Sequence, residues 1–252
     1  MIQSVQKATR ILNILAENRQ EPIPLGALAE ACGMPKATCA HIISTLENTG
    51  YAVKISARKG YILGPAAYCL SRFGRYKSDF VTLCRPILEY LHKTTGHTVI
   101  LAVLEGSSKY IIDYIDKNHI LDNHTEILED DIYRTATGRA ILANLPETKI
   151  YDVYKKYGNP KEEEWASVSS LSELLSLLPE KKEIAKSRAV SSDFVNLGFG
   201  AALFSAAECV GAVGIAVKLP KDKESAFSDE ETKIRQLLKT GASEITRRLS
   251  AR

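Results

Sequence analysis

Three short helical patterns, the last two separated by one tight turn, constrain the fold of the first 66 residues more than any other feature of this sequence. Apolar residues recur at helical spacing from Val5 to Leu15 and again from Leu25 to Cys32. Gly33 can end the second helix in the left-handed conformation. Pro35 suits the first turn of a third helix, because its missing N–H would have no intrahelical partner there. The predicted connection is therefore only Gly33-Met34.

The third helix, ending near Gly50, is followed by a predicted β-hairpin with a basic turn over residues 56–60. This order of elements is typical of a winged helix-turn-helix, whose third helix enters the major groove of DNA. We predict that the hairpin turn contacts phosphates or the minor groove. The predicted DNA-binding residues lie on the polar side of the third helix and at the hairpin turn: Lys36, Ala37, Thr38, His41, Ser44, Thr45, Arg58 and Lys59.

The distribution of charge supports the same interpretation. Residues 1–66 carry seven Lys or Arg and four Asp or Glu, whereas residues 67–252 carry 26 of each. The excess positive charge therefore lies where contact with DNA phosphates requires it. A small helical bundle that contacts only proteins is the alternative, but the complete order of helices and hairpin favours double-stranded DNA as the partner.

The rest of the chain mixes helices and strands, which indicates an α+β fold in which an antiparallel sheet is flanked by helices. We place a linker helix at residues 67–77 and a second domain at 78–252. The apolar patterns predict helices over Ser78–Gly96, Gly138–Leu145, Leu171–Ser187 and Ser228–Leu249, and strands over Thr98–Leu104, Tyr110–Ile115, Ala201–Ser205 and Cys209–Val217. Pro179 is expected to break or kink the third of these helices.

Several blocks of this sequence form a recognisable set. They are Ser4–Leu12, Leu25–Thr38, Leu46–Tyr51 and Gly60–Pro65 in the first domain, and Thr98–Gly106, Tyr133–Ala140 and Gly211–Ala216 in the second. In these blocks the chain resembles the IclR family of transcriptional regulators. The spacing between the blocks agrees as well, and the resemblance covers nearly the whole chain. It implies a GAF-like second domain that binds a small-molecule effector and assembles homodimers or homotetramers. Repression is the commoner activity that the resemblance implies.

The resemblance also implies where the effector binds. The corresponding positions of this chain are Ala136, Thr137, Gly138, Ser191, Asp193, Ala201, Gly214 and Ala216. Well-studied family members carry an acidic residue, a cysteine and serines where this chain has Ser191, Ala201, Gly214 and Ala216. We therefore expect a less polar lining, with room for a bulkier or more apolar molecule than a small oxoacid. Asp193 and Asn196 either bind the effector or form a turn.

The third helix differs from the family pattern at two positions that face DNA. His41 stands where relatives often have arginine, and Ala37 stands where they have serine. His41 lacks the fork of donors with which arginine contacts guanine, so we expect a different operator sequence. It contacts a base or a phosphate, or it is a solvated residue on the helix face.

Residues with metal-binding or catalytic chemistry form no standard site. Asp113, Asp116, His119, Asp122 and His124 offer oxygen and imidazole donors, but their spacing matches an ordinary strand that leaves the sheet. No phosphate-binding glycine loop and no hydrolase motif occurs. We therefore expect no catalytic residue, no cofactor and no metal. The alternative is a metal- or metabolite-dependent sensor or enzyme domain with an appended winged helix.

The apolar segments and cysteines bear on where the chain works. No apolar run approaches the roughly 20 residues that a membrane helix needs, and the N-terminal residues lack the pattern of a signal peptide. The five cysteines are scattered, which favours reduced thiols over a disulfide framework, and Cys209 is expected to be a buried, inert thiol. We expect a cytoplasmic protein with no membrane partner.

Overall fold

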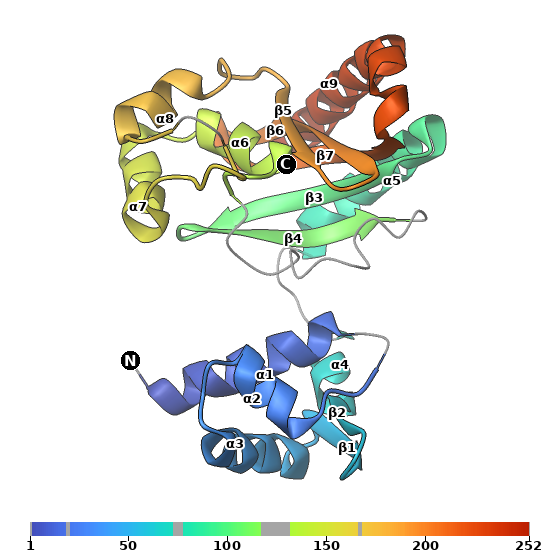
Figure 1. Ribbon diagram of the computed structural model, residues 1–252. Helices are drawn as coiled ribbons and strands as arrows, with labels where there is room; N and C mark the ends of the chain where they lie inside the picture. Colours follow the sequence, from blue (N-terminus) through green and yellow to red (C-terminus); the bar gives the residue numbers. More distant parts are fainter. Residues whose placement is uncertain (1, 19–20, 73–77, 117–131, 166–167, 252) are drawn as a thin grey trace. The chain divides into compact units, whose positions relative to one another are not determined.

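The computed structural model describes residues 2–18, 21–72, 78–116, 132–165 and 168–251. The chain divides into two compact units, Met1–Ser78 and Asp79–Arg252 (Figure 1). Each unit has hydrophobic core residues of its own, as independently folding domains require. None of the helices in these ranges has the length and hydropathy that a membrane span needs.

The first unit consists of helices around a small core, with a two-stranded hairpin at one edge. Its helices are α1 (Gln3–Glu17), α2 (Leu25–Ala31), α3 (Lys36–Asn48) and α4 (Pro65–Arg72), and its strands are β1 (Ala52–Ser56) and β2 (Gly60–Leu63). Ile11, Leu28, Cys39 and Ile43 are completely buried between the first three helices. The helix-turn-helix with its hairpin, predicted from apolar spacing, is confirmed. The predicted linker helix overlaps α4, and residues 73–77 lie outside the described ranges.

The turn between α2 and α3 follows the local signals in the sequence. Gly33 has a φ of 63°, in the left-handed region that favours glycine. The Gly33 N–H donates to the Glu30 carbonyl at 2.9 Å, and the Met34 N–H donates to the Ala29 carbonyl at 3.0 Å, which ends α2. Pro35 directly precedes the first residue of α3. These contacts fix the short connection that sets α3 against α2.

The second unit is built on one antiparallel sheet of five strands in the order β4-β3-β7-β6-β5. The strands are β3 (Thr98–Glu105), β4 (Ser108–Ile115), β5 (Ala185–Val190), β6 (Phe194–Ser205) and β7 (Glu208–Pro220). The remaining helices are α5 (Ser78–Thr95), α6 (Ala136–Ala143), α7 (Glu147–Tyr157), α8 (Leu171–Leu177), the 3₁₀ helix η2 (Lys221–Phe227) and α9 (Ser228–Ser250). The fold is therefore α+β, as predicted.

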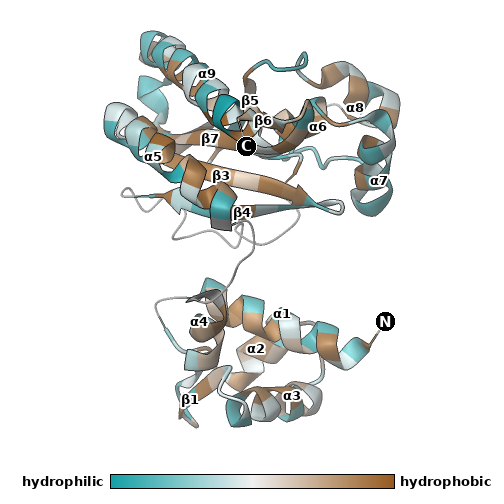
Figure 2. Cartoon of the chain, turned by 180° about the vertical axis from the view of Figure 1, so that it is seen from behind, coloured by the Kyte–Doolittle hydropathy of each residue, from teal (hydrophilic) through white to brown (hydrophobic). Residues whose placement is uncertain are grey.

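Both faces of this sheet are covered by helices. One core cluster joins α5 and α9 to alternate residues of β6 and β7, such as Phe199 and Val213. A second cluster joins α6, α7 and α8 to residues on the other side, such as Ala102 and Ala212. Figure 2 shows that β3 and β7, in the middle of the sheet, are hydrophobic over most of their length. A strand buried on both faces needs such a continuous apolar sequence.

The prediction of a helix over Leu171–Ser187 is wrong in its second half. Helix α8 ends at Leu177, and Leu178 is extended (φ −60°, ψ 138°) before Pro179, because a residue before proline avoids the helical region. Residues 185–190 form β5, which pairs along its whole length with β6. Pairing with a distant strand cannot be read from the apolar spacing of this short segment.

Other elements also differ from the predictions. Helix α6 begins two residues early, at Ala136, because the side chain of Thr135 accepts a hydrogen bond from the Gly138 N–H and caps it. Helix α7 was not predicted, since its buried stripe consists only of Ile150 and Val153. Strand β6 begins at Phe194, seven residues before the predicted start.

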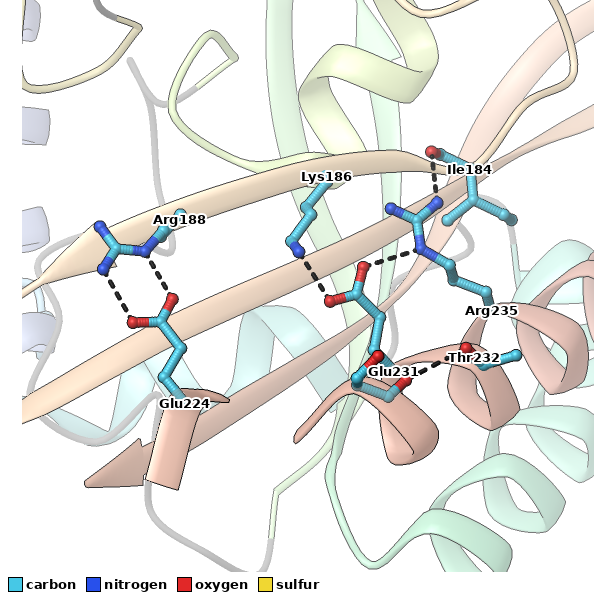
Figure 3. A network of polar contacts seen from close by, with 8 residues as sticks. Ile184, Lys186, Arg188, Glu224, Glu231, Thr232 and Arg235 are labelled. Atoms are coloured by element: carbon cyan, nitrogen blue, oxygen red, sulfur yellow. Dashed lines mark hydrogen bonds and ion pairs between the residues drawn. The ribbon is translucent and has the colours of Figure 1, made fainter. Parts of the chain in front are cut away.

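Ion pairs tie β5 to the elements that follow β7 (Figure 3). Arg188 of β5 makes two hydrogen bonds with the Glu224 carboxylate of η2, at 2.6 and 2.8 Å. Glu231 of α9 accepts from Lys186 at 2.6 Å and from Arg235 at 3.0 Å. The hydrogen bonds from Arg188 lower the pKa of Glu224. Burial by itself raises the pKa of Glu231, but the hydrogen bonds from Lys186 and Arg235 together lower it below its usual value. These contacts join the edge strand β5 to η2 and to the first turn of α9.

Candidate functional site

The exposed side of α3 is the first candidate site. Cys39, Ile43 and Leu46 face the core and are buried. Of the residues predicted to contact DNA, Lys36, Ala37, His41, Ser44 and Thr45 are exposed, and Thr38 is half-buried. The Thr45 hydroxyl donates to the His41 carbonyl of the preceding turn at 3.2 Å. The helix therefore offers a polar face of small side chains that could follow a groove closely.

The β1–β2 hairpin carries the predicted basic turn. Arg58 and Lys59 are exposed, and the Lys59 N–H donates to the Ser56 hydroxyl at 3.0 Å. Two hydrogen bonds between Ile23 and Tyr61, at 2.8 and 2.9 Å, hold β2 against the segment before α2. A Cβ atom on Gly60 would lie 2.0 Å from the Ile23 carbonyl oxygen, so only glycine fits this approach. The hairpin is thus fixed to the helices, with its cations in solvent.

The second candidate site is a cavity of about 240 Å³ between the first turn of α6 and the sheet. Glycines of β6 and β7 let the first turn of α6 pack closely against the sheet beside the cavity: a Cβ atom on Gly200 would lie 2.3 Å from the Ala136 carbonyl oxygen, and one on Gly214 would lie 2.5 Å from Thr137 Cγ2. The residues that line the cavity are Ile100, Lys109, Ile111, Arg134, Thr135, Ala136, Thr137, Ser187, Ala189, Val190, Ser191, Asn196, Leu197, Gly198, Phe199, Gly214, Ile215 and Ala216.

Few polar groups face this mostly apolar cavity, and most are held by one another. The Lys109 side chain is buried, and its ammonium donates to the Thr135 hydroxyl at 3.0 Å. The Ser187 hydroxyl accepts from the Ala136 N–H at 3.1 Å. Asn196 Oδ1 is buried and has no hydrogen-bond partner among the described residues. A buried acceptor of this kind costs free energy unless a donor reaches it, so the cavity suits a ligand with one polar group opposite Asn196.

The structure brings together most of the residues predicted to bind the effector. Ala136, Thr137, Ser191, Gly214 and Ala216 line the cavity. Gly138, Asp193 and Ala201 do not. Gly138 lies against the Ile132 backbone instead, Asp193 is exposed in the turn between β5 and β6, and Ala201 faces α9. Sequence analysis missed Lys109 and Arg134, and a lysine beside a hairpin turn gives no signal of burial.

The two aspartates of the group with metal-binding chemistry, at which no metal was expected, have other partners. Asp113 accepts from Arg85 at 2.7 Å, and Asp116 accepts from the Thr98 hydroxyl at 2.7 Å. His119, Asp122 and His124 lie outside the described residues. Within the described ranges, no group of three or more His, Cys, Asp or Glu side chains could hold a metal ion.

The cysteines are all free thiols. Cys32, Cys39 and Cys84 are buried, Cys69 is exposed, and Cys209, predicted to be buried, is half-buried. Burial raises the pKa of the Cys209 thiol, and burial raises the pKa of Cys39 to about 11. A protonated thiol is a poor nucleophile, so neither side chain has the chemistry of a catalytic cysteine.

Two family models match the chain and together span most of it. The IclR helix-turn-helix domain matches residues 4–56, and the model described as bacterial transcriptional regulator IclR C-terminal matches residues 76–247. The chain is 24% identical to the transcriptional repressor IclR of Escherichia coli strain K12 over 160 residues. That match covers 62% of this chain and 58% of the relative, so the chain spans less than two thirds of the relative's length.

Solved structures share the fold over nearly the whole chain. A regulator from Alicyclobacillus acidocaldarius superposes with a TM-score of 0.74 at 21% identity, covering 99% of this chain and 100% of the other. A homologue from Microbacterium hydrocarbonoxydans, solved in complex with 4-hydroxybenzoate, superposes with a TM-score of 0.68 at 13% identity. It covers 98% of this chain and 100% of that chain. At these identities the likeness concerns the fold.

Proposed function

The chain belongs to the IclR family of transcriptional regulators, and on that basis we propose that it is a repressor whose hold on operator DNA is controlled by a small metabolite. Members of this family regulate transcription and are not enzymes in general. The observation that carries the proposal is the cavity under α6, which has room for a small ligand. The same chain has an exposed polar face on α3, which is available to DNA. The metabolite would act from the cytoplasm, where the operator is.

The DNA side of the proposal rests on the geometry of the first unit. Helix α3 offers Lys36, Ala37, Thr38, His41, Ser44 and Thr45 to the major groove, and the hairpin offers Arg58 and Lys59 to the backbone. We propose that the chain binds as a homodimer, or as a pair of dimers, on half-sites related by two-fold symmetry. Ala37 and His41 set an operator sequence particular to this chain.

An Arg58→Ala variant should bind every duplex more weakly, by a similar factor, because a phosphate contact carries no sequence information. The slope of log affinity against log salt concentration should become shallower by about one per protomer. Fluorescence anisotropy with operator and unrelated duplexes at several salt concentrations measures both effects. Lys155→Ala, an exposed cation on α7 of the other unit, is the matched control. An unchanged salt slope would place the hairpin turn away from DNA.

The cavity indicates which class of effector to expect. Its walls include Ile100, Ile111 and Leu197, and the buried Lys109 ammonium contributes a positive charge beside Thr135. A single-ring carboxylate with a hydroxyl group would place its ring on the apolar walls, its carboxylate toward Lys109 and its donor toward Asn196 Oδ1. The homologue that binds 4-hydroxybenzoate supports this choice, since that molecule has all three parts. The effector shifts the regulator only through its different affinities for the DNA-bound and free forms.

We expect 4-hydroxybenzoate or a related single-ring carboxylate to raise the melting temperature of the protein, increasingly with concentration. A Lys109→Met variant, which keeps the side-chain length without the charge, should lose the shift, and Asn196→Leu should weaken it. Differential scanning fluorimetry of the full chain gives the measurement. Ser205→Ala, at the far end of β6, is the control. A shift that survives in both cavity variants would show that carboxylates bind elsewhere.

A further inference from the structure

A second cavity, of about 520 Å³, lies on the side of the sheet that α9 covers. The end of β6, the turn between β6 and β7, the segment before β5 and the last three turns of α9 surround it. Its floor consists of the alanines at 201, 202 and 242, which are nearly buried. Small side chains on two packed elements leave the space open. This cavity does not share a lining residue with the cavity under α6.

The charged groups around this cavity are all cationic. Lys182, Lys239 and Arg247 line it, and no Asp or Glu does. Neither lysine makes an ion pair within the described part of the chain. Arg247 does pair with Glu244, at 2.8 Å through each of two nitrogens, but Glu244 also accepts from Arg248 at 2.7 Å. One carboxylate thus serves two guanidinium groups, and the rim keeps a net positive charge that an anion would neutralise.

The donors are arranged along one line of α9. Lys239, Ser243 and Arg247 follow one another at intervals of four residues, so their side chains lie on the same side of the helix. The Ser243 hydroxyl stands between the two cations. Across the cavity, the Lys182 ammonium lies 5.7 Å from the centre of the Phe204 ring. Donors therefore face the cavity from α9 and from the segment before β5, with an aromatic ring beside them.

Lys182, in the cavity wall, is held in a backbone conformation that is unfavourable for a lysine, with a φ of 67°. Ala206 and Ala207, with φ of 47° and 69°, form the two-residue turn between β6 and β7, where left-handed residues are usual. Left-handed residues other than glycine persist only when the surroundings fix them, and they concentrate at functional sites. The Lys182 N–H donates to Asn144 Oδ1 at 2.9 Å, which holds this conformation in place. This backbone conformation fixes where the Lys182 side chain enters the cavity wall, as a ligand-binding lysine requires.

We propose that this second cavity binds a small phosphate monoester. A phosphate monoester carries close to two negative charges at neutral pH and three acceptor oxygens, which match two lysines, an arginine and a hydroxyl better than a singly charged carboxylate does. The phosphate lies among Lys182, Lys239, Ser243 and Arg247. The organic part of the ligand contacts the Phe204 ring and the alanine floor. The proposal is independent of the effector site under α6.

Isothermal titration calorimetry of the full chain with phenyl phosphate tests this proposal. We expect saturable binding that weakens by roughly tenfold for each lysine replaced in Lys182→Gln and Lys239→Gln, as expected for the loss of a charge-assisted contact. Benzoate, with the same ring and one charge, should bind this site more weakly when both ligands are titrated into the Lys109→Met variant, in which the cavity under α6 lacks its positive charge. Lys233→Gln, an exposed position of α9 that does not line the cavity, should leave the affinity unchanged.

Ser243→Leu provides a second test, because it fills the cavity from an exposed helix position and leaves the core intact. It should abolish phenyl phosphate binding without lowering the melting temperature. An absence of saturation at millimolar phenyl phosphate would overturn the proposal, and so would an unchanged affinity in both lysine variants compared with the unsubstituted protein. It would also be overturned if Ser243→Leu changed only the oligomeric state in sedimentation, since the cavity would then be a contact between copies.

Discussion

An Arg139→Ala variant should be destabilised by about 3 kcal/mol or more, since three backbone carbonyls lose their donor at once. The guanidinium of Arg139 donates to the carbonyls of Tyr133 at 2.7 Å, Glu164 at 2.7 Å and Lys186 at 2.9 Å. Burial lowers its pKa to about 10, so it remains charged at neutral pH. The guanidinium carbon Cζ of Arg139 lies 4.1 Å from the centre of the Trp165 ring.

These contacts join three segments that are distant in sequence. Tyr133 lies before α6, Glu164 follows α7, and Lys186 is in the edge strand β5. Without the guanidinium, the three carbonyls lose their hydrogen-bond donor in a partly buried region that water reaches poorly. We therefore expect the cavity under α6 to lose its shape along with the stability of the unit, because Ala136 and Ser187 lie next to these segments.

Urea unfolding followed by circular dichroism measures the effect on the free energy of unfolding. Arg139→Lys should recover only part of the loss, because one ammonium cannot reach three diverging carbonyls. Arg188→Ala is the matched control: it also removes an arginine that serves β5, but its ion pair with Glu224 is exposed and should matter far less. Equal losses in Arg139→Ala and Arg188→Ala would contradict this account.

A Gly200→Ala variant should lose roughly 1–3 kcal/mol, the usual cost of overpacking a close contact. The added Cβ atom would lie 2.3 Å from the Ala136 carbonyl oxygen and 2.8 Å from the Thr137 nitrogen. Both are backbone atoms, so no side chain can rotate away, and the first turn of α6 must move off the sheet. Binding at the cavity under α6 should fall as well, since the same turn lines it.

Gly26→Ala makes the opposite prediction and serves as the control. Gly26 is in the exposed part of α2, and nothing lies within 4 Å of a Cβ atom placed there. Alanine in a helix is favoured over glycine by up to about 1 kcal/mol, so this variant should be slightly more stable. Thermal unfolding of both variants checks the contrast. If Gly200→Ala were also stabilised, α6 would not rest on β6 as tightly as the distances indicate.

The first unit was predictable because its signals are local. Gly33, Pro35 and the spacing of apolar residues each act within one or two turns of helix, and the structure places the turn and α3 where they indicate. The second unit depends on pairing between strands far apart in sequence, such as β3 with β7. No local pattern specifies that order. The edge strand β5 was accordingly mistaken for the end of a helix.

The predicted effector-site position on β6 is one residue away from a position that faces α6. Ala201 was expected at the effector site, but it points to α9, whereas its neighbour Gly200 points to α6. Side chains alternate between the two faces of a strand. If the family pattern is matched to this chain one residue out of register, the predicted site residue therefore falls on the opposite side of the sheet. The burial of Lys109 could not be anticipated from local sequence, because its hydrogen-bond partner Thr135 is distant in the chain.

The ion pairs of β5 have a consequence beyond stability. Among the described strands, β5 pairs with β6 alone, and its other edge meets no strand, although Arg139 donates to the carbonyl of Lys186. An open edge can recruit a strand from a second molecule and begin an aggregate. Two β5 edges brought together would set Lys186 and Arg188 against the same cations of another copy, and the carboxylates of η2 and α9 would hold them in place. We therefore expect the ion-pair network to disfavour edge-to-edge pairing of this sheet with a second copy.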